Sequence, residues 1–360
     1  MDKIESALRV GPGSMVPEPP ADLIARASNR RHALTRDQYV DGILAAERTI
    51  LARAITLIES SRPADRFLAD QIVEDCLPHG GKSIRVGITG VPGAGKSSLI
   101  EELGNYLVGQ LHQKVAVLAI DPSSQLSGGS ILGDKTRMTS LASSEMAFIR
   151  PTPSRRYAGG VAQRTREAML LCEAAGYQNI LIETVGVGQS ETAVHDMVDF
   201  FLLITLAGAG DELQGIKRGV MELADLVAIN KADGANVQAA ERARSEAQNA
   251  LHYFPRMASG WTPRALACSA ATGSGIAELW SSVLEHDALT RNNGWLHLNR
   301  RNQTRTWMHE IIQHELLQQF ESHPDVRERM HALEQDVLAG HTTSFRAAHS
   351  LLAMYSGRNS

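Results

Sequence analysis

The chain has 360 residues, which is enough to bury a sizeable core and to carry one large domain with additions. Hydrophobic residues make up 43% and charged residues 21%, as is typical of a soluble globular protein. The formal net charge of −4 argues against a nucleic-acid or anionic-membrane partner, and no apolar run is long enough to span a membrane. The three cysteines, Cys76, Cys172 and Cys268, lack the spacing of a metal site or of a disulfide framework. We therefore expect them to be buried thiols in a reducing compartment, the cytoplasm.

The N-terminal part predicts a loose arm followed by helices. Residues 16–36 are rich in Pro, Ala and Arg without clear periodicity, and the stretch Gly11–Met15 resembles a cloning scar, so we expect the arm over residues 1–35. From Arg36 to Ile58 apolar residues recur at helical spacing, and a second helix is expected over Asp65–Leu77. We therefore expect a helical extension over residues 36–82 that packs against the next domain.

A glycine-rich stretch between a strand pattern and a helix pattern predicts phosphate binding. An apolar run ends at Thr89, a loop of the form G-x-x-x-x-G-K-S follows, and Lys96 and Ser97 open a helical pattern. The glycines allow backbone amides to turn toward an anion, and the helix N-terminus adds partial positive charge. We expect Lys96 to reach the β- and γ-phosphates and Ser97 to hold Mg²⁺; the alternative is a connector without a ligand. The predicted phosphate-binding residues are Gly90, Val91, Pro92, Gly93, Ala94, Gly95, Lys96, Ser97 and Ser98.

Strands and helices alternate over residues 83–290, which predicts an α/β fold of the P-loop NTPase type, with a mainly parallel sheet covered on both faces. Beyond the P-loop we expect a helix over Val161–Ala175 and strands at Val115–Ile120, Ala147–Arg150, Asn179–Glu183, Asp199–Thr205, Leu226–Asn230 and Ala265–Cys268. Asp121 ends the first of these strands, where ligands bind in open α/β sheets, and Asp134 follows a Gly/Ser-rich loop able to move with nucleotide state. Each is a candidate Mg²⁺ ligand or, alternatively, a turn-forming residue.

Two short motifs indicate which base is bound. Asn230-Lys231-Ala232-Asp233 directly follows a predicted strand, and an Asp carboxylate there can accept two hydrogen bonds that guanine donates and adenine cannot. Lys231 would lie along the base, and Asn230 would brace the loops. The next strand is followed by a Ser-Ala element, typical of a backbone contact to guanine O6: Ser269, Ala270 and Ala271. Downstream of a P-loop, the two motifs predict GTP rather than ATP.

The expected γ-phosphate contact follows the strand Asn179–Glu183, where Glu183 takes the place of the usual Asp. Glu183 can hold Mg²⁺ directly or through water, and the Gly186 N–H would contact the γ-phosphate; the alternative is that Glu183 merely ends a strand. Val187 stands where Ras-like GTPases carry the Gln that orients the attacking water, so we expect slow hydrolysis that needs help from a partner, a second subunit or another loop. The predicted catalytic residues are Lys96, Asp121, Asp134 and Glu183.

Residues 291–360 predict a helical tail. Apolar residues recur at helical spacing from Met308 to Phe320, Pro324 precedes another helix, and Phe345–Met354 marks the last one. The tail shows no chemistry of its own, and its apolar stripe fits packing on its own domain as well as self-association.

Taken together, these motifs resemble those of the MeaB/ArgK-type G proteins, chaperones of adenosylcobalamin-dependent methylmalonyl-CoA mutase and related acyl-CoA mutases. The stretches that carry the resemblance follow the family's order: Gly90–Ser98, Asp121–Ser124, Gly133–Met138, Glu183–Glu191, Gly208–Lys217 and Asn230–Asp233. The resemblance implies a SIMIBI-class GTPase with Mg²⁺ and GTP or GDP, which gates cobalamin loading and protects or reactivates its mutase. It also implies a homodimer held partly by residues 291–360. It further places Asp211, Gln214 and Lys217 on a third switch loop, although these residues alone would suggest an ordinary loop entering a helix.

One stretch departs from the family pattern. Before the double glycine Gly159-Gly160, relatives usually carry a small pair and Leu, whereas this chain has the bulky Arg156 and Tyr157. These residues mark a different local loop or a different client mutase. Two other functions are the alternatives. A nickel or cobalt metallochaperone GTPase would need a His-rich or Cys-x-x-Cys segment, which is missing, and an ArgK-like kinase or transport ATPase would prefer adenine, which Asp233 disfavours.

Overall fold

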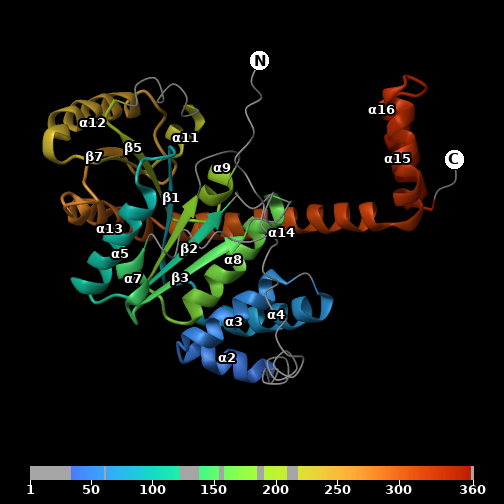
Figure 1. Cartoon of the computed structure of the whole chain (residues 1–360), viewed down its shortest axis with the longest axis horizontal. Coiled ribbons are helices and arrows are strands. Elements are labelled where there is room, and N and C mark those ends of the chain that lie inside the picture. The colour runs from blue at the N-terminus through green and yellow to red at the C-terminus, as the bar shows by residue number, and fades with distance from the viewer. Residues whose placement is uncertain are drawn as a thin grey trace, which may run out of the picture.

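The structure is a computed structural model that describes residues 34–60, 62–121, 138–153, 158–184, 190–208 and 218–357. Its centre is a seven-stranded sheet in the order β3-β2-β4-β1-β5-β6-β7, in which every neighbouring pair is parallel (Figure 1). The strands are β1 Ile84–Gly90, β2 Val115–Asp121, β3 Ala147–Pro153, β4 Asn179–Thr184, β5 Phe200–Leu206, β6 Leu226–Asn230 and β7 Arg264–Ala267. The predicted parallel α/β fold is confirmed, and the carboxyl ends of all strands meet at one edge.

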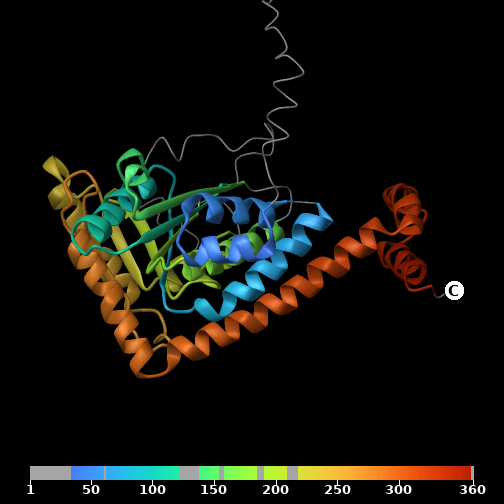
Figure 2. The same ribbon diagram turned by 90° about the horizontal axis from the view of Figure 1, so that it is seen from below.

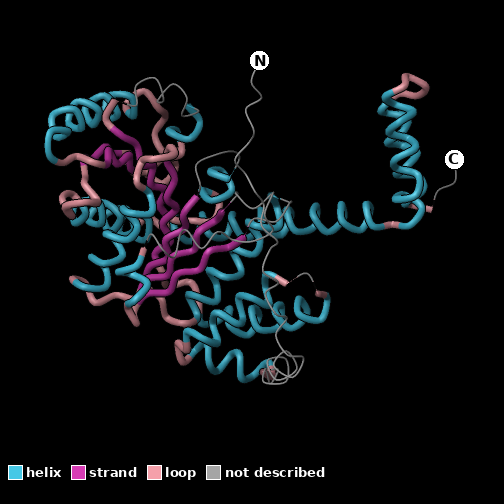
Figure 3. The backbone as a smooth tube through the Cα atoms, viewed as in Figure 1, coloured by secondary structure: helices cyan, strands magenta, loops and turns pink. Residues whose placement is uncertain are grey.

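Helices cover both faces of the sheet, which Figure 3 shows as one continuous twisted layer. Along β4, Ile180 and Ile182 pack in one hydrophobic cluster and Leu181 packs in another, because successive side chains of a strand point to opposite faces. The face of Leu181 is covered by α5 (Lys96–Gly109) and α13 (Ile276–Asn292), with α7 (Thr139–Ser143) beside α5. The other face is covered by α8 (Ala158–Ala174), α9 (Ser190–His195) and α12 (Val237–Leu251), while α11 (Arg218–Glu222) precedes β6.

The N-terminal helices pack on α8, as predicted, but their number differs from the prediction. The continuous periodicity from Arg36 to Ile58 belongs to two helices, α2 (Arg36–Leu44) and α3 (Arg48–Glu59), which are followed by α4 (Pro63–Cys76). The chain turns at Ala46, whose φ is 60°, and a Cβ on Gly42 would lie 2.3 Å from Ile50 Cδ1. A sharp turn with such close packing keeps the apolar residues of both helices on one side, so periodicity alone did not reveal the break.

The C-terminal tail forms one long helix and a helical pair. After Gly294, whose φ is 78°, α14 (Trp295–Ser322) runs for 28 residues past α8 and away from the sheet (Figure 2). At its far end lie α15 (Pro324–Leu338) and α16 (Ser344–Tyr355), which contact each other. The predicted helices are present, and apolar side chains on α14 are exposed: Met308, Ile312, Leu316 and Leu317.

All three cysteines are buried and free, which confirms the prediction of buried thiols. Burial raises the pKa of Cys76 to about 11 and that of Cys268 to about 12, so both thiols stay protonated at neutral pH. Among the described helices, none combines the length and apolar character that a membrane crossing requires.

Candidate nucleotide-binding site

The P-loop connects the carboxyl end of β1 to the first turn of α5, and its glycines are required by close approaches. Gly90 has a φ of 156°, and a Cβ there would lie 2.2 Å from the Ile204 carbonyl oxygen of β5. Gly95 has a φ of 85°, and its Cβ would lie 2.7 Å from Asn230 Nδ2. Only glycine fits both places without strain. The loop leads directly into the first turn of α5, and the backbone N–H groups of a helix N-terminus are suited to bind an anion.

The Lys96 side chain folds over this loop. Its Nζ donates to the carbonyl oxygens of Gly90, at 2.9 Å, and Val91, at 3.3 Å. Lys96 is half-buried, and its ammonium beside the loop is a point charge of the kind that attracts phosphate oxygens.

Ser97 and Glu183 meet at the same edge of the sheet. The register pairs Ile88 of β1 with Glu183 of β4, and the Ser97 hydroxyl donates to Glu183 Oε1 at 2.8 Å. Glu183 is 6% exposed. A hydroxyl oxygen and a carboxylate oxygen beside a phosphate loop are the hard donors that Mg²⁺ prefers, so the residues present fit this ion. Asp121 ends β2, the other neighbour of β4, and so its backbone lies at this edge as well.

Several predicted site residues lie outside the described part of the chain. They are Asp134, Gly186, Asp211, Gln214 and Lys217, together with the side chain of Asp121 and the unusual Arg156 and Tyr157. Their predicted roles stay predictions.

Asn230 joins the P-loop to the loop after β7. Its Nδ2 donates to the Ala94 carbonyl oxygen at 2.8 Å, and its Oδ1 accepts from the Ala270 N–H at 3.1 Å. Lys231, with a φ of 60°, donates from Nζ to the Gly93 carbonyl oxygen at 3.0 Å. The expected bracing of the loops by Asn230 is therefore present, and the segment after β6 is fixed against the phosphate loop.

The Asp233 carboxylate is held by the Ser269 hydroxyl, which donates to Asp233 Oδ2. Ser269 is buried, and its Oγ also accepts from the Thr272 N–H at 3.3 Å. The Ala232 N–H donates to the Cys268 carbonyl oxygen at 2.9 Å. The carboxylate thus points in a fixed direction between two loops, as recognition of a base edge requires.

Sequence reasoning missed two kinds of supporting residue. Asn236 donates from Nδ2 to the Lys231 carbonyl oxygen at 2.7 Å, and the buried hydroxyls of Thr89 and Thr184 bond to each other at 2.8 Å. A threonine in a strand is ordinary, so only the strand order could have paired these two residues.

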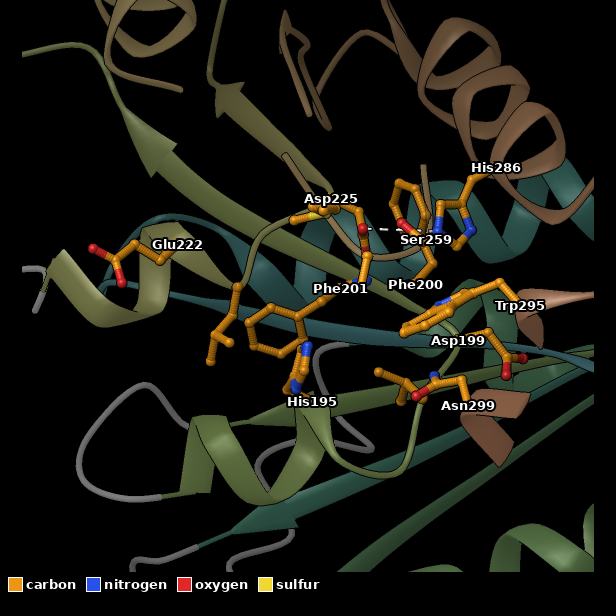
Figure 4. A pocket seen from close by; sticks show the side chains of 14 residues that line it. His195, Asp199, Phe200, Phe201, Glu222, Asp225, Ser259, His286, Trp295 and Asn299 are labelled. Atoms are coloured by element: carbon orange, nitrogen blue, oxygen red, sulfur yellow. Dashed lines mark hydrogen bonds and ion pairs between the residues drawn. The ribbon is translucent and has the colours of Figure 1, made fainter. Parts of the chain in front are cut away.

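A separate pocket of about 200 Å³ lies at the opposite edge of the sheet, beside the amino ends of β5 and β6 (Figure 4). Asp225 and His286 face each other across it, with 3.7 Å between His286 Nε2 and Asp225 Oδ1. Burial raises the pKa of Asp225 to about 7 and lowers that of His286 to about 4. None of the predicted nucleotide-binding residues lines this pocket.

The chain is similar to known proteins over most of its length. Residues 51–325 match the family model described as "Methylmalonyl Co-A mutase-associated GTPase MeaB". "GTPase ArgK" of Escherichia coli is 46% identical over 300 residues, which cover 82% of this chain and 90% of that protein. "Methylmalonic aciduria type A homolog, mitochondrial" of Mus musculus is 44% identical over 333 residues, 90% of this chain and 80% of that protein.

Among solved structures, one described as "LAO/AO transport system kinase" superposes with a TM-score of 0.70 at 36% identity, covering 89% of this chain and 97% of that one. This chain is therefore a GTPase that belongs to the MeaB family of methylmalonyl-CoA mutase-associated GTPases.

Proposed function

We propose that this protein binds and hydrolyses GTP in order to gate cofactor loading into an adenosylcobalamin-dependent acyl-CoA mutase, such as methylmalonyl-CoA mutase, and to protect or reactivate that enzyme. The observation that carries the nucleotide part is the Asp233 carboxylate, held by Ser269 beside a phosphate loop that Asn230 braces. The client is supported by the family description and by the name of the mouse relative. The buried free thiols support a reducing compartment such as the cytoplasm.

Each part of the site has a separate task in this proposal. Backbone amides of residues 90–98 and the Lys96 ammonium hold the β- and γ-phosphates, and Asp233 accepts from guanine N1–H and N2–H₂. Ser97 and Glu183 would hold Mg²⁺, with Asp121 and Asp134 as further candidates, and the ion would supply neutralisation of phosphate charge. Water then adds to the γ-phosphorus while the bond to the β–γ bridging oxygen breaks, which releases GDP and phosphate.

Hydrolysis by the isolated protein is slow in this proposal. Val187 cannot orient a water molecule as a Gln would, so the missing group comes from the mutase, from a second subunit or from another loop of this chain. The segment with Asp211, Gln214 and Lys217 joins β5 to α11 and serves as the third switch, responding to the bound mutase.

The proposed oligomer is a homodimer formed partly by residues 291–360. The apolar side chains on the outer part of α14 support this, because Met308, Ile312 and Leu316 are each about half exposed on a helix that leaves the sheet. A second copy of the same helical arm would bury them.

The proposed function is tested by measuring nucleotide affinity and phosphate release with the purified protein, alone and with a cobalamin-dependent acyl-CoA mutase. We expect GTP and GDP to bind with ATP excluded, turnover to be slow, and addition of the mutase to raise it. Lys96→Ala should abolish turnover and serves as the control. Equal affinity for ATP would refute guanine recognition. A mutase that neither associates nor stimulates in any nucleotide state would refute the chaperone role.

A further inference from the structure

Two buried threonines are bonded to each other between the two central strands of the sheet. Thr184 Oγ1 of β4 donates to Thr89 Oγ1 of β1 at 2.8 Å, and the residues are 0% and 1% exposed. Valine has the same shape as threonine and fills a buried strand position at no polar cost, whereas a buried hydroxyl is costly unless it is bonded. The pair therefore calls for a reason beyond packing.

The position of the two threonines in the sheet gives a functional reason for their hydrogen bond. The register between β1 and β4 ends where Ile88 lies opposite Glu183, and Thr89 and Thr184 are the next residues of the two strands. The hydroxyl bond thus continues the connection between the strands one residue beyond their last register pair. Gly90, whose carbonyl oxygen receives Lys96, follows Thr89 directly.

The same bond restrains Glu183 from the far side of the sheet. Side chains alternate along a strand, so Glu183 points to the face where Ser97 opens α5, and Thr184 points to the face of α8 and α9. With Thr184 tied to Thr89, the end of β4 cannot twist or slide relative to the phosphate loop without breaking a buried hydrogen bond. The Glu183 carboxylate is thereby kept within reach of the Ser97 hydroxyl.

We propose that Thr184 and Thr89 are positioning residues for GTP hydrolysis, which act by holding Glu183 and the phosphate loop in register. The inference rests on the proposed function of the site. It concerns the phosphate half of the site, since the Asp233 side chain is held separately by Ser269.

The test begins with Thr184→Val, which removes the donor and keeps the shape. We expect kcat to fall about tenfold while KM for GTP stays within about twofold, because the groups that bind the base and the phosphates remain. The gain in GDP affinity that Mg²⁺ gives over EDTA should shrink as well, since it depends on the placement of Glu183 and Ser97. Thr184→Ser keeps the donor and should restore most of both quantities.

A double variant separates positioning from stability. Thr184→Val alone leaves the Thr89 hydroxyl buried without this bond and lowers the free energy of unfolding, whereas Thr89→Val/Thr184→Val removes both hydroxyls and should recover much of it. Turnover should stay low in the double variant. Recovery of turnover together with stability would overturn the inference and assign the pair a packing role.

Thr205→Val is the matched control. Thr205 is 1% exposed near the end of β5, and its hydroxyl has no hydrogen-bond partner within the described part of the chain. Its substitution should leave turnover at the wild-type value.

Wild-type turnover by Thr184→Val overturns this inference alone, while a wild-type protein that neither binds nor hydrolyses GTP overturns both this inference and the proposed function.

Discussion

At the scale of single residues, the site depends on polar side chains that are held by other side chains. The Asp233 carboxylate is fixed by a buried hydroxyl, and Asn230 uses both ends of its amide to join two loops. Such groups discriminate strongly, because a wrong ligand leaves a fixed polar atom without a partner.

Replacing Asp233 with Asn should weaken GDP binding by about 100-fold or more, because an amide presents a donor where guanine also donates. Xanthosine nucleotides, which carry an acceptor at that position, should bind the variant better than guanosine nucleotides do. Fluorescence titration with labelled GDP and competition with XDP measure both effects. Asp41→Asn, an exposed change on α2, is the control. Unchanged guanine affinity in Asp233→Asn would remove the assigned role.

The buried Asp225 carboxyl should make the free energy of unfolding depend on pH. Burial raises its pKa from 3.8 to about 7, although the Phe201 N–H donates to it at 2.8 Å. The folded state therefore binds more protons than the unfolded state between these two pH values. The contribution of Asp225 to the free energy of unfolding is complete below pH 3.8 and is lost as pH rises through 7. His286 has the opposite sign, since its lowered pKa costs stability as pH falls from 6.5 toward 4.

The variant Asp225→Asn isolates the first effect, because it keeps the shape and removes the titration. The free energy of unfolding of wild type minus that of the variant should fall by up to about 4 kcal/mol between pH 4 and pH 8. Urea denaturation at several pH values measures the difference, and the term from His286 is common to both proteins. A difference that is constant with pH would show that the Asp225 carboxyl titrates as an exposed one does.

At the scale of elements, a buried ion pair anchors α14 to the sheet. Arg300 donates from Nε and Nη2 to the two carboxylate oxygens of Asp199, at 2.8 and 2.6 Å, and Asp199 Oδ2 also accepts from the Arg85 N–H of β1. Farther along the helix, Arg166 of α8 lies over the Trp307 ring and pairs with Glu310 at 2.6 Å. The base of the long helix is therefore part of the nucleotide-binding fold.

Replacing Arg300 with Ala should lower the free energy of unfolding by about 3–5 kcal/mol, because it leaves the Asp199 carboxylate, 2% exposed, without its charge partner. Arg244→Ala breaks the exposed pair with Glu241 on α12 and should cost less than about 1 kcal/mol. Denaturation by urea compares the two variants. Equal losses would mean that burial does not distinguish these ion pairs.

At the scale of the whole molecule, the outer half of α14 and the α15–α16 pair extend away from the sheet (Figure 2). Beyond α14, this arm carries further apolar side chains that are exposed: Leu338, Phe345 and Leu352. The division into an arm over 1–35, a helical extension over 36–82, a GTPase domain over 83–290 and a dimerisation arm over 291–360 stays a prediction.

If the arm forms the dimer, charge on its apolar stripe should separate the subunits. Ile312→Glu/Leu316→Glu should shift the protein from dimer to monomer in light scattering, because two carboxylates would be buried at the interface. GDP affinity should stay at the wild-type value, since the proposed guanine and phosphate sites lie at the edge of the sheet. Gln318→Glu adds a charge at an exposed polar position of the same helix and serves as the control. A double variant that remains dimeric would place the interface elsewhere.

The sequence by itself determined the strand, loop and helix of the P-loop, the place of Asn230–Asp233 directly after a strand, and the positions of the seven strands, because each depends on neighbours along the chain. A positive φ demands glycine, a buried strand demands an apolar run, and a carboxylate after a strand end faces the ligand edge. The predicted ends of the strands and helices differ little from the observed ends. Asp199, predicted to begin β5, instead precedes it and binds Arg85 and Arg300, while Pro63, outside the predicted helix, begins α4, where proline fits the first turn.

Only the tertiary structure decided which distant residues meet. The break at Ala46, the Arg300–Asp199 pair across 101 residues and the Thr184–Thr89 bond across 95 residues leave no local pattern. These contacts depend on the strand order β2-β4-β1-β5 and on the direction in which α14 leaves α13. The physical reason is that hydrophobic burial and buried hydrogen bonds select partners in space, whereas periodicity and propensity record only what lies within a few residues along the chain.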